Sequence, residues 1–243
     1  GPLKETTRKK GRGEENSSKE IKCTKAGCEE VGRQKSCTEG EMTESVYIAF
    51  EGPEACGKST QARRLAESIG AVLTRETGGT SIGEQLRSIL HNVDTIGLDY
   101  HAETLIVAAD RAQHLAEVVR PALERGEHVV SDRSVYSTLA YQGYGRGLPV
   151  DEVRRINEWA IGSTWPDLVI LLVTDDATLE RRMNQRELDR IEQAGADFHQ
   201  RVREGFAEMA AADPTRWYVI DASTPADETA ETIREAVRER LGI

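Results

Sequence analysis

The sequence has no long run of apolar residues, and this absence excludes two classes of protein. The longest unbroken run, residues 168–173, contains six residues. A membrane-spanning helix needs about 20 apolar residues, and the core of a secretion signal needs about 7 to 15. We therefore expect neither a membrane span nor an export signal.

Lysine is scarce in most of the chain, and its distribution divides the sequence in two. Seven of the eight lysines precede Glu41, and Lys58 is the only one after Met42. Residues 1–41 are rich in charged and small polar residues and nearly free of aliphatic ones, so they cannot bury enough apolar surface to fold. We expect a disordered polar extension, whose first three residues resemble a protease-cleavage scar, followed by one domain over residues 42–243.

The chain also lacks excess basic charge and paired cysteines. Its 32 Lys and Arg residues face 42 Asp and Glu residues, for a formal net charge of −10, which argues against binding along a nucleic-acid backbone. Cys23, Cys28 and Cys37 lie in the extension, without a Cys-x-x-Cys pair or a histidine partner at zinc-ligand spacing. We expect no structural zinc and a reduced, cytoplasmic protein.

From residue 46 onward, apolar β-branched segments alternate with amphipathic ones. The expected strands are 46–50, 71–73, 128–130, 168–173 and 217–220. The expected helices are 59–69, 82–91, 102–120, 150–161, 177–186, 197–212 and 226–241. This alternation predicts an α/β fold with a central five-stranded parallel sheet, helices on both faces, and ligands at the carboxyl ends of the strands.

A phosphate-binding loop follows the first expected strand. In such a loop, backbone N–H groups surround phosphate oxygens, the lysine reaches the terminal phosphates and the Ser hydroxyl binds Mg²⁺. Arginine cannot replace a compact ammonium there, so the isolated Lys58 of an arginine-rich domain indicates a specific role. The residues expected to bind ATP are Gly52, Pro53, Glu54, Ala55, Cys56, Gly57, Lys58, Ser59 and Thr60.

Loops of this kind serve GTPases, ATP-driven motors and small-molecule kinases. A guanine-reading Asn-Lys-x-Asp motif is excluded, because no lysine follows Lys58. Asp132 and Arg133 are expected at the end of the third strand, where Mg²⁺ and phosphate would bind, with a structural ion pair as the alternative. Arg111, in a mostly apolar helix, needs either a phosphate or a structural carboxylate as its partner. A kinase fits best.

The sequence resembles the thymidylate kinase family, whose members transfer a phosphoryl group from ATP to dTMP. The resemblance covers about residues 46–241; besides the phosphate loop, it rests on residues 74–80, 110–114, 131–134, 137–143 and 187–192. It implies a P-loop NTPase fold in which Arg111 and Arg133 bind the dTMP phosphate. It further implies that Ser137 and Thr138 contact the thymine edge.

The same resemblance assigns two residues beside the sugar and places a lid after the fourth strand. Glu54 would reach either the 3′-hydroxyl or a metal-bound water, and Tyr141, expected in a loop, would occupy the place of a 2′-hydroxyl. Because the phosphate loop contains no arginine and phosphoryl transfer needs positive charge, the lid, about residues 182–194, is expected to deliver Arg186 and also Arg182. A solvated helix face is the alternative interpretation of these arginines.

Three positions depart from the family pattern. Thr77 replaces a proline, Ser134 replaces a ring-bearing residue, and Val107 replaces a phenylalanine that stacks on thymine. Losing a base–aromatic stack of about 1–3 kcal/mol should weaken or broaden base selection.

We predict a dTMP kinase with ATP as co-substrate, Mg²⁺ as cofactor, and no nucleic-acid or membrane partner. The candidate catalytic residues are Lys58, Asp132, Arg182 and Arg186, and the candidate metal ligands are Ser59 and Asp132. Another nucleoside monophosphate kinase and a nucleotide-binding module without activity are the alternatives. A homodimer is expected from the resemblance alone.

Overall fold

The structure is a computed structural model, and it describes residues 44–183 and 188–243. The chain divides after Met42, and the described residues belong to the second part. The polar extension predicted for residues 1–41 lies outside the described residues, so its disorder stays a prediction.

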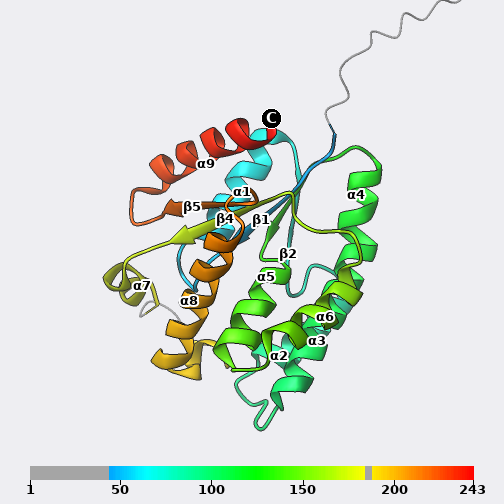
Figure 1. Cartoon of the computed structure of the whole chain (residues 1–243), viewed down its shortest axis with the longest axis vertical. Helices are drawn as coiled ribbons and strands as arrows, with labels where there is room; N and C mark the ends of the chain where they lie inside the picture. Colours follow the sequence, from blue (N-terminus) through cyan, green and yellow to red (C-terminus); the bar gives the residue numbers. More distant parts are fainter. Residues whose placement is uncertain (1–43, 184–187) are drawn as a thin grey trace, which may run out of the picture. The chain divides into compact units, whose positions relative to one another are not determined.

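Five parallel strands form one sheet in the order β2-β3-β1-β4-β5 (Figure 1). They are β1 (Tyr47–Glu51), β2 (Val72–Arg75), β3 (Val129–Asp132), β4 (Leu168–Val173) and β5 (Trp217–Asp221). The predicted fold class is confirmed, and each expected strand is present. Four strands continue past their apolar run to a charged residue, namely Glu51, Arg75, Asp132 and Asp221. The carboxyl edge of the sheet therefore carries charged side chains.

The helices cover the sheet between these strands. They are α1 (Lys58–Ile69), α2 (Ser81–His91), α3 (Tyr100–His114), α4 (Arg120–Glu124), α5 (Val135–Thr138), α6 (Val150–Ile161), α7 (Asp176–Met183), α8 (Ala196–Ala212) and α9 (Ala226–Leu241). Shorter π-helical and 3₁₀ segments are η1 (Leu115–Val119), η2 (Leu139–Gly145) and η3 (Glu192–Ala194).

Two helical predictions need correction. The helix expected over 102–120 is divided into α3, η1 and α4, and the π-helical turn comes just before Pro121, which has no N–H to donate. Tyr141 lies in η2 and not in a loop. Gly143, also in η2, allows close packing, since a Cβ there would lie 3.2 Å from the side chain of Val150. The helix expected over 177–186 is observed to Met183. Residues 184–186 of that expected helix lie outside the described residues.

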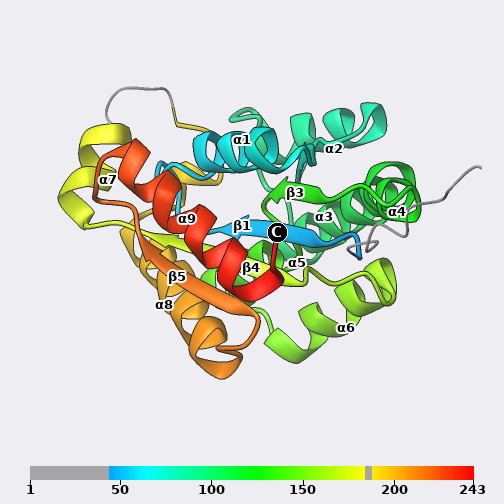
Figure 2. The ribbon, with the colours of Figure 1, turned by 90° about the horizontal axis from the view of Figure 1, so that it is seen from above.

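Alternate strand residues face opposite layers of helices, as expected for a buried parallel sheet. One face carries Ile48, Phe50, Val130, Ile170 and Leu172 and is covered by α1 and α9. The other carries Tyr47, Val129, Val169, Leu171 and Trp217 and is covered by α5, α6, α8, η1 and η2. Figure 2 shows α1 and α8 on opposite sides of the sheet.

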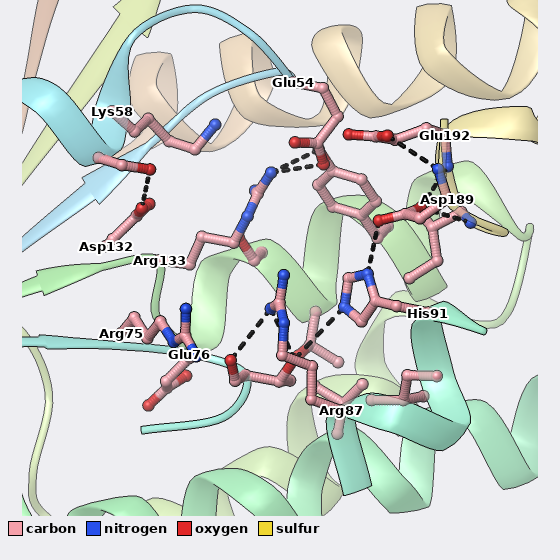
Figure 3. A pocket seen from close by; sticks show the side chains of 18 of the residues that line it. Glu54, Lys58, Arg75, Glu76, Arg87, His91, Asp132, Arg133, Asp189 and Glu192 are labelled. Atoms are coloured by element: carbon pink, nitrogen blue, oxygen red, sulfur yellow. Dashed lines mark hydrogen bonds and ion pairs between the residues drawn. The ribbon is translucent and has the colours of Figure 1, made fainter. Parts of the chain in front are cut away.

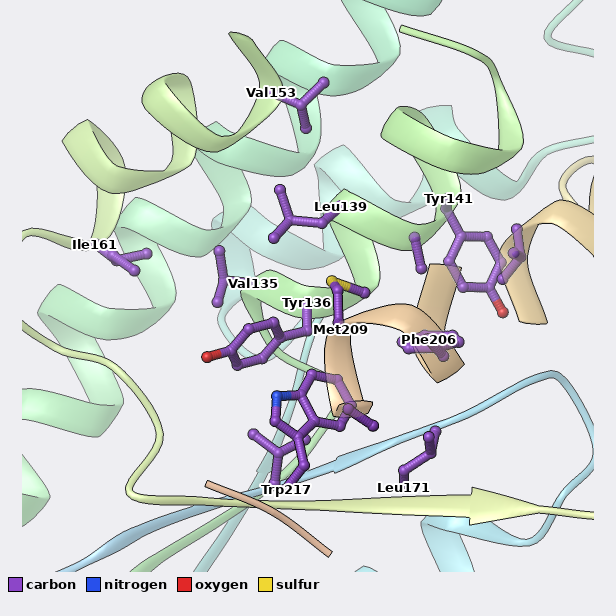
Figure 4. Packing of buried hydrophobic residues seen from close by; sticks show 14 of the residues in the cluster. Val135, Tyr136, Leu139, Tyr141, Val153, Ile161, Leu171, Phe206, Met209 and Trp217 are labelled. Atoms are coloured by element: carbon purple, nitrogen blue, oxygen red, sulfur yellow. The ribbon is translucent and has the colours of Figure 1, made fainter. Parts of the chain in front are cut away.

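Aromatic residues fill the second layer. Trp217 of β5 meets Tyr136 of α5 edge to face, with ring centroids 4.7 Å apart, beneath Met209 of α8 (Figure 4). This packing fixes α5, and therefore the chain that leaves β3, against the sheet. None of the helices in the described ranges is long and apolar enough to cross a membrane.

Candidate active site

The loop between β1 and α1 closes tightly against the neighbouring strand. Gly52 has a φ of 140°, and a Cβ there would lie 2.4 Å from the carbonyl oxygen of Leu172. Only glycine fits such a position. Gly57, with a φ of 101°, leads directly into α1. The glycines of the motif thus bring the loop backbone and the amino end of α1 together, which is the arrangement that binds phosphate.

Lys58 is held inside this loop. Its side chain is buried, and Nζ donates a hydrogen bond to the carbonyl oxygen of Pro53 at 2.6 Å and lies 3.6 Å from Sγ of Cys56. The ammonium therefore lies within the loop backbone, and its assignment to the terminal phosphates of ATP stays a prediction.

Ser59 and Asp132 meet at the mouth of the loop. The Ser59 hydroxyl, at the start of α1, donates a hydrogen bond to Oδ2 of Asp132, at the end of β3. No group of three or more His, Cys, Asp or Glu side chains that could hold a metal occurs in residues 44–183 or 188–243. One carboxylate and one hydroxyl fit Mg²⁺, which usually takes few protein ligands and keeps waters or substrate phosphates. They do not fit a closed zinc site.

Arg133 lies at the centre of a second group of polar residues. It follows β3 with a φ of 76°, and its backbone N–H donates to the carbonyl oxygen of Phe50 at 2.9 Å. Its guanidinium donates to Glu54 at 2.6 Å, to the Tyr141 hydroxyl at 3.1 Å and to the Ser137 hydroxyl at 3.0 Å. Figure 3 shows Arg133 directed toward Glu54, with Lys58 and Asp132 nearby. The phosphate loop and the end of β3 are therefore joined by an ion pair.

This ion pair is permanently charged. Burial alone would raise the pKa of Glu54, but Arg133 and Lys58 outweigh it and lower that pKa to about 2. Burial opposes the charge of Arg133 as well, yet Glu54 raises the pKa of that guanidinium well above its usual value. A carboxylate fixed in its ionised form can accept a hydrogen bond from a substrate hydroxyl at any physiological pH.

Arg111 has a structural carboxylate as its partner. Its side chain is almost completely buried, and Nε donates to Oε2 of Glu76 at 2.7 Å. Burial would raise the pKa of Glu76, but Arg111 outweighs it and the pKa is lowered. The remaining hydrogen bonds of the guanidinium go to Thr138 Oγ1, Asn157 Oδ1 and the carbonyl oxygen of Ser134. Of the two partners that the sequence left open for Arg111, the structure contains the carboxylate.

One cavity of about 490 Å³ brings these groups together. Its wall includes Glu54, Ala55 and residues 57–60 of the phosphate loop, the strand-end residues Asp132 and Arg133, and three apolar side chains, Leu90, Val107 and Ile191. The basic residues that line it are Lys58, Arg75, Arg87, Arg111, Arg133 and Arg182. The predicted ATP loop, metal ligands and acceptor residues therefore share a single space.

Arg87 is a site residue that sequence reasoning missed. Its guanidinium donates to the carbonyl oxygen and hydroxyl of Thr77, at 3.0 and 3.3 Å. No ion pair within the described residues includes it. Burial lowers the pKa of Arg87, and the positive charge of Arg75 lowers it further. Arg75 and Arg133 are paired with Glu84 and Glu54, respectively. Arg87 therefore adds to the cavity a positive charge that no ion pair of the described residues balances, and this favours an anionic ligand.

The remaining predicted site residues take different positions. Ser137, Thr138 and Tyr141 all line the cavity. The Ser137 hydroxyl donates to Oε2 of Glu51 at 2.6 Å, and Thr138 accepts from Arg111. Arg182 lies beside the phosphate loop and donates to the carbonyl oxygen of Ala55 at 3.1 Å.

Arg186 lies outside the described residues, so its assignment as a catalytic arginine stays a prediction. The segment that follows it is anchored at two points. Asp189 accepts from His91 at 2.6 Å, as Figure 3 shows, and Arg190 donates to buried Glu103 at 2.7 Å. The C-terminal part of the predicted lid is thereby attached to α2 and α3.

The family model described as Thymidylate kinase matches residues 50–233, which is most of the described domain. The chain belongs to the thymidylate kinase family. It is 44% identical over 202 residues to the thymidylate kinase of Bifidobacterium longum strain DJO10A, covering 80% of this chain and 98% of that protein. It is 43% identical over 204 residues to the thymidylate kinase of Bacillus pumilus, covering 81% and 96%. The crystal structure of thymidylate kinase from Ehrlichia chaffeensis matches with a TM-score of 0.67 and 30% identity, covering 80% of this chain and 98% of that one.

Proposed function

We propose that this chain transfers the γ-phosphoryl group of ATP to dTMP, giving ADP and dTDP. The observation that carries the proposal is the shared cavity, in which the phosphate loop faces an ion pair, a metal-ligand pair and a cluster of guanidinium groups. In phosphoryl transfer the protein mainly aligns donor and acceptor and neutralises their charge, and it does not need to form a covalent bond to the phosphoryl group. We therefore expect direct transfer from ATP to the acceptor, without a phosphoenzyme.

The donor nucleotide occupies the phosphate-loop end of the cavity. Lys58 and the amino end of α1 bind its phosphates. A smaller hollow of about 290 Å³ adjoins the loop, lined by Cys56, Thr60 and Arg182 among others. We assign the base of ATP to this hollow because it adjoins the loop that binds the phosphates. Ser59 and Asp132 would hold Mg²⁺, which when bound neutralises charge on the phosphate oxygens.

The acceptor monophosphate binds where Arg87 and Arg133 converge. Both guanidinium groups line the cavity, and a phosphate accepts charge-assisted hydrogen bonds from such groups strongly. Glu54 accepts a hydrogen bond from the sugar, and Tyr141, held by Glu54 and Arg133, leaves no room for a 2′-hydroxyl. The base lies toward Thr138 and Val107. Arg186 supplies the lid's positive charge, on the strength of the resemblance alone.

Another nucleoside monophosphate is the second candidate acceptor, and Val107 favours it. This side chain lines the cavity together with Leu90 and Ile191, so the wall beside the base is aliphatic. An aliphatic wall selects among bases less sharply than an aromatic stack.

We also infer a homodimer through α2, α3 and α6, which pack against one another. Large apolar side chains are exposed on them: Ile82 and Ile89 of α2, Leu105 of α3 and Trp159 of α6, the last 88% exposed. Ile82 and Ile89 are seven residues apart and share one helix face. A second copy of the same surface would cover them. Sedimentation at several concentrations tests this inference, and a monomer at all of them contradicts it.

We place the protein in the cytoplasm, where buried Cys56 would stay reduced.

The experiment that tests the function is ADP release with ATP and one acceptor at a time: dTMP, dUMP, dCMP or dAMP. We expect the highest kcat/KM with dTMP and negligible release without an acceptor. A higher kcat/KM with another acceptor would indicate a different nucleoside monophosphate kinase. No acceptor-dependent release in a folded sample would indicate a nucleotide-binding module without activity.

A further inference from the structure

Glu51 is a buried carboxylate that the reaction itself does not use. It ends β1, its exposed fraction is 0%, and it is not among the described residues that line the cavity. No ion pair within the described ranges includes it. Burial raises its pKa, even though neighbouring charges and hydroxyls oppose that effect. A buried carboxylate requires hydrogen-bond donors, and the identity of those donors indicates what it does.

Within residues 44–183 and 188–243, the hydrogen bonds that the Glu51 carboxylate accepts come from two serines beyond β3. Oε1 accepts from the backbone N–H and the hydroxyl of Ser134, at 2.8 and 2.7 Å, and from the N–H of Ser137 at 3.2 Å. Oε2 accepts from the hydroxyl of Ser137 at 2.6 Å. Glu51 therefore fixes the turn that leads from β3 into α5. That turn contains Arg133, whose backbone lies in the left-handed region at a φ of 76°.

A relay connects Glu51 to the guanidinium of Arg133. Because the Ser137 hydroxyl has a single proton and gives it to Glu51, its lone pairs are directed toward other donors. Arg133 NH1 donates to that oxygen at 3.0 Å, while NH2 donates to Glu54 and to Tyr141. The orientation of the Arg133 fork thus depends on a hydroxyl whose own direction Glu51 sets.

We propose that Glu51 is a positioning residue for acceptor binding, acting through Ser137 on Arg133. The role rests on the proposed function, since Arg133 is assigned there to the acceptor phosphate. Among the described residues, no hydrogen bond joins Lys58 or Ser59 to this relay, although Arg133 itself reaches the phosphate loop at Glu54 and at the carbonyl oxygen of Gly52. Loss of Glu51 should therefore affect the acceptor and leave the donor almost unchanged.

Glu51→Gln tests the proposal, because glutamine keeps the shape but has one acceptor oxygen and a donor amide, so it cannot accept from both serine hydroxyls. We expect the KM for dTMP to rise about tenfold, the size of one net hydrogen bond, while the KM for ATP changes by less than about twofold. Glu67→Gln, an exposed position on α1, is the matched control. Equal effects on both substrates, or no effect, would overturn the proposal.

Ser137→Ala provides the second arm, and it also covers the case in which Glu51→Gln does not fold. It removes the relay while Glu51 keeps its bonds to Ser134 and to the Ser137 N–H. We expect the same selective rise, and the double variant should be no worse than Ser137→Ala alone, because both changes break one path. A rise with Ser137→Ala beside a folded, unaffected Glu51→Gln would mean that Ser137 contacts the substrate directly, and would overturn the relay.

The failure of this proposal is distinguishable from failure of the proposed function. If the wild-type protein transfers nothing to dTMP, the function is wrong. If it does and the Glu51 variant retains the wild-type KM for dTMP, only the positioning role is wrong.

Discussion

Replacing Arg111 with methionine should lower the free energy of unfolding by more than it weakens the binding of either substrate. Glu76 and Arg111 are each about 2% exposed and lie 2.7 Å apart. Methionine fills most of the volume but leaves the Glu76 carboxylate buried without its guanidinium. Removing one partner of a buried ion pair costs about 3–5 kcal/mol. For a domain of this size, that loss corresponds to a fall in Tm of about 6–20 °C.

Urea unfolding and differential scanning calorimetry measure this change. Arg63→Met is the matched control, because Arg63 is exposed on α1 and should change stability by less than about 0.5 kcal/mol. The double variant Arg111→Met with Glu76→Gln should be less destabilised than the single one, since it removes the buried charge that has lost its guanidinium and keeps only the contact with His114. A single variant with the wild-type unfolding midpoint and only a raised KM for dTMP would show that Arg111 serves the substrate and not the core.

Three further predictions concern the cavity. Lys58→Ala should abolish transfer with an unchanged Tm, because Lys58 neutralises charge that ATP brings; normal turnover in a coupled ADP assay would remove the phosphate-loop argument. Arg87→Gln should raise the KM for dTMP by about 10- to 150-fold, the value of a charge-assisted hydrogen bond of about 1.5–3 kcal/mol, with the KM for ATP unaffected. An unchanged KM for dTMP would leave Arg87 a structural residue. Val107→Phe should tighten dTMP binding by about 1 kcal/mol in calorimetric titration; weaker binding by a folded variant would show that Val107 does not face the base.

The sequence was sufficient for those parts of the site that depend on strand ends. Parallel strands place their carboxyl ends along one edge, so residues directly after a buried strand can be brought together without knowledge of the helices. This reasoning placed Lys58, Ser59, Asp132 and Arg133 in the same region, and the structure has all four around one cavity.

The parts that depend on helix faces and long-range partners could not be predicted. In the sequence, Arg87 resembles any exposed arginine of an amphipathic helix. Its place in the site depends on contacts with Thr77 and on the charge of Arg75, and both of these residues lie at or after the end of β2. The partner of Arg111 was expected to be anionic, but Glu76 lies 35 residues away. No local pattern distinguishes that carboxylate from a phosphate. Tyr141 was expected in a loop because the packing of Gly143 against Val150, which accompanies the helical turn η2, is a tertiary contact.

The covering of one sheet face by α1 and α9 has a consequence for synthesis. The apolar residues of α1, namely Ala62, Leu65 and Ala66, pack in the same layer as Ile233 and Val237 of α9. Gln61 also donates to the carbonyl oxygen of Ala226, 165 residues away. Until α9 has emerged from the ribosome, α1, the helix that follows the phosphate loop, lacks the cover that α9 provides. Nucleotide binding should therefore begin only after α9 has left the exit tunnel. Until then, the apolar face of the sheet that α1 and α9 cover stays partly exposed and can form incorrect contacts.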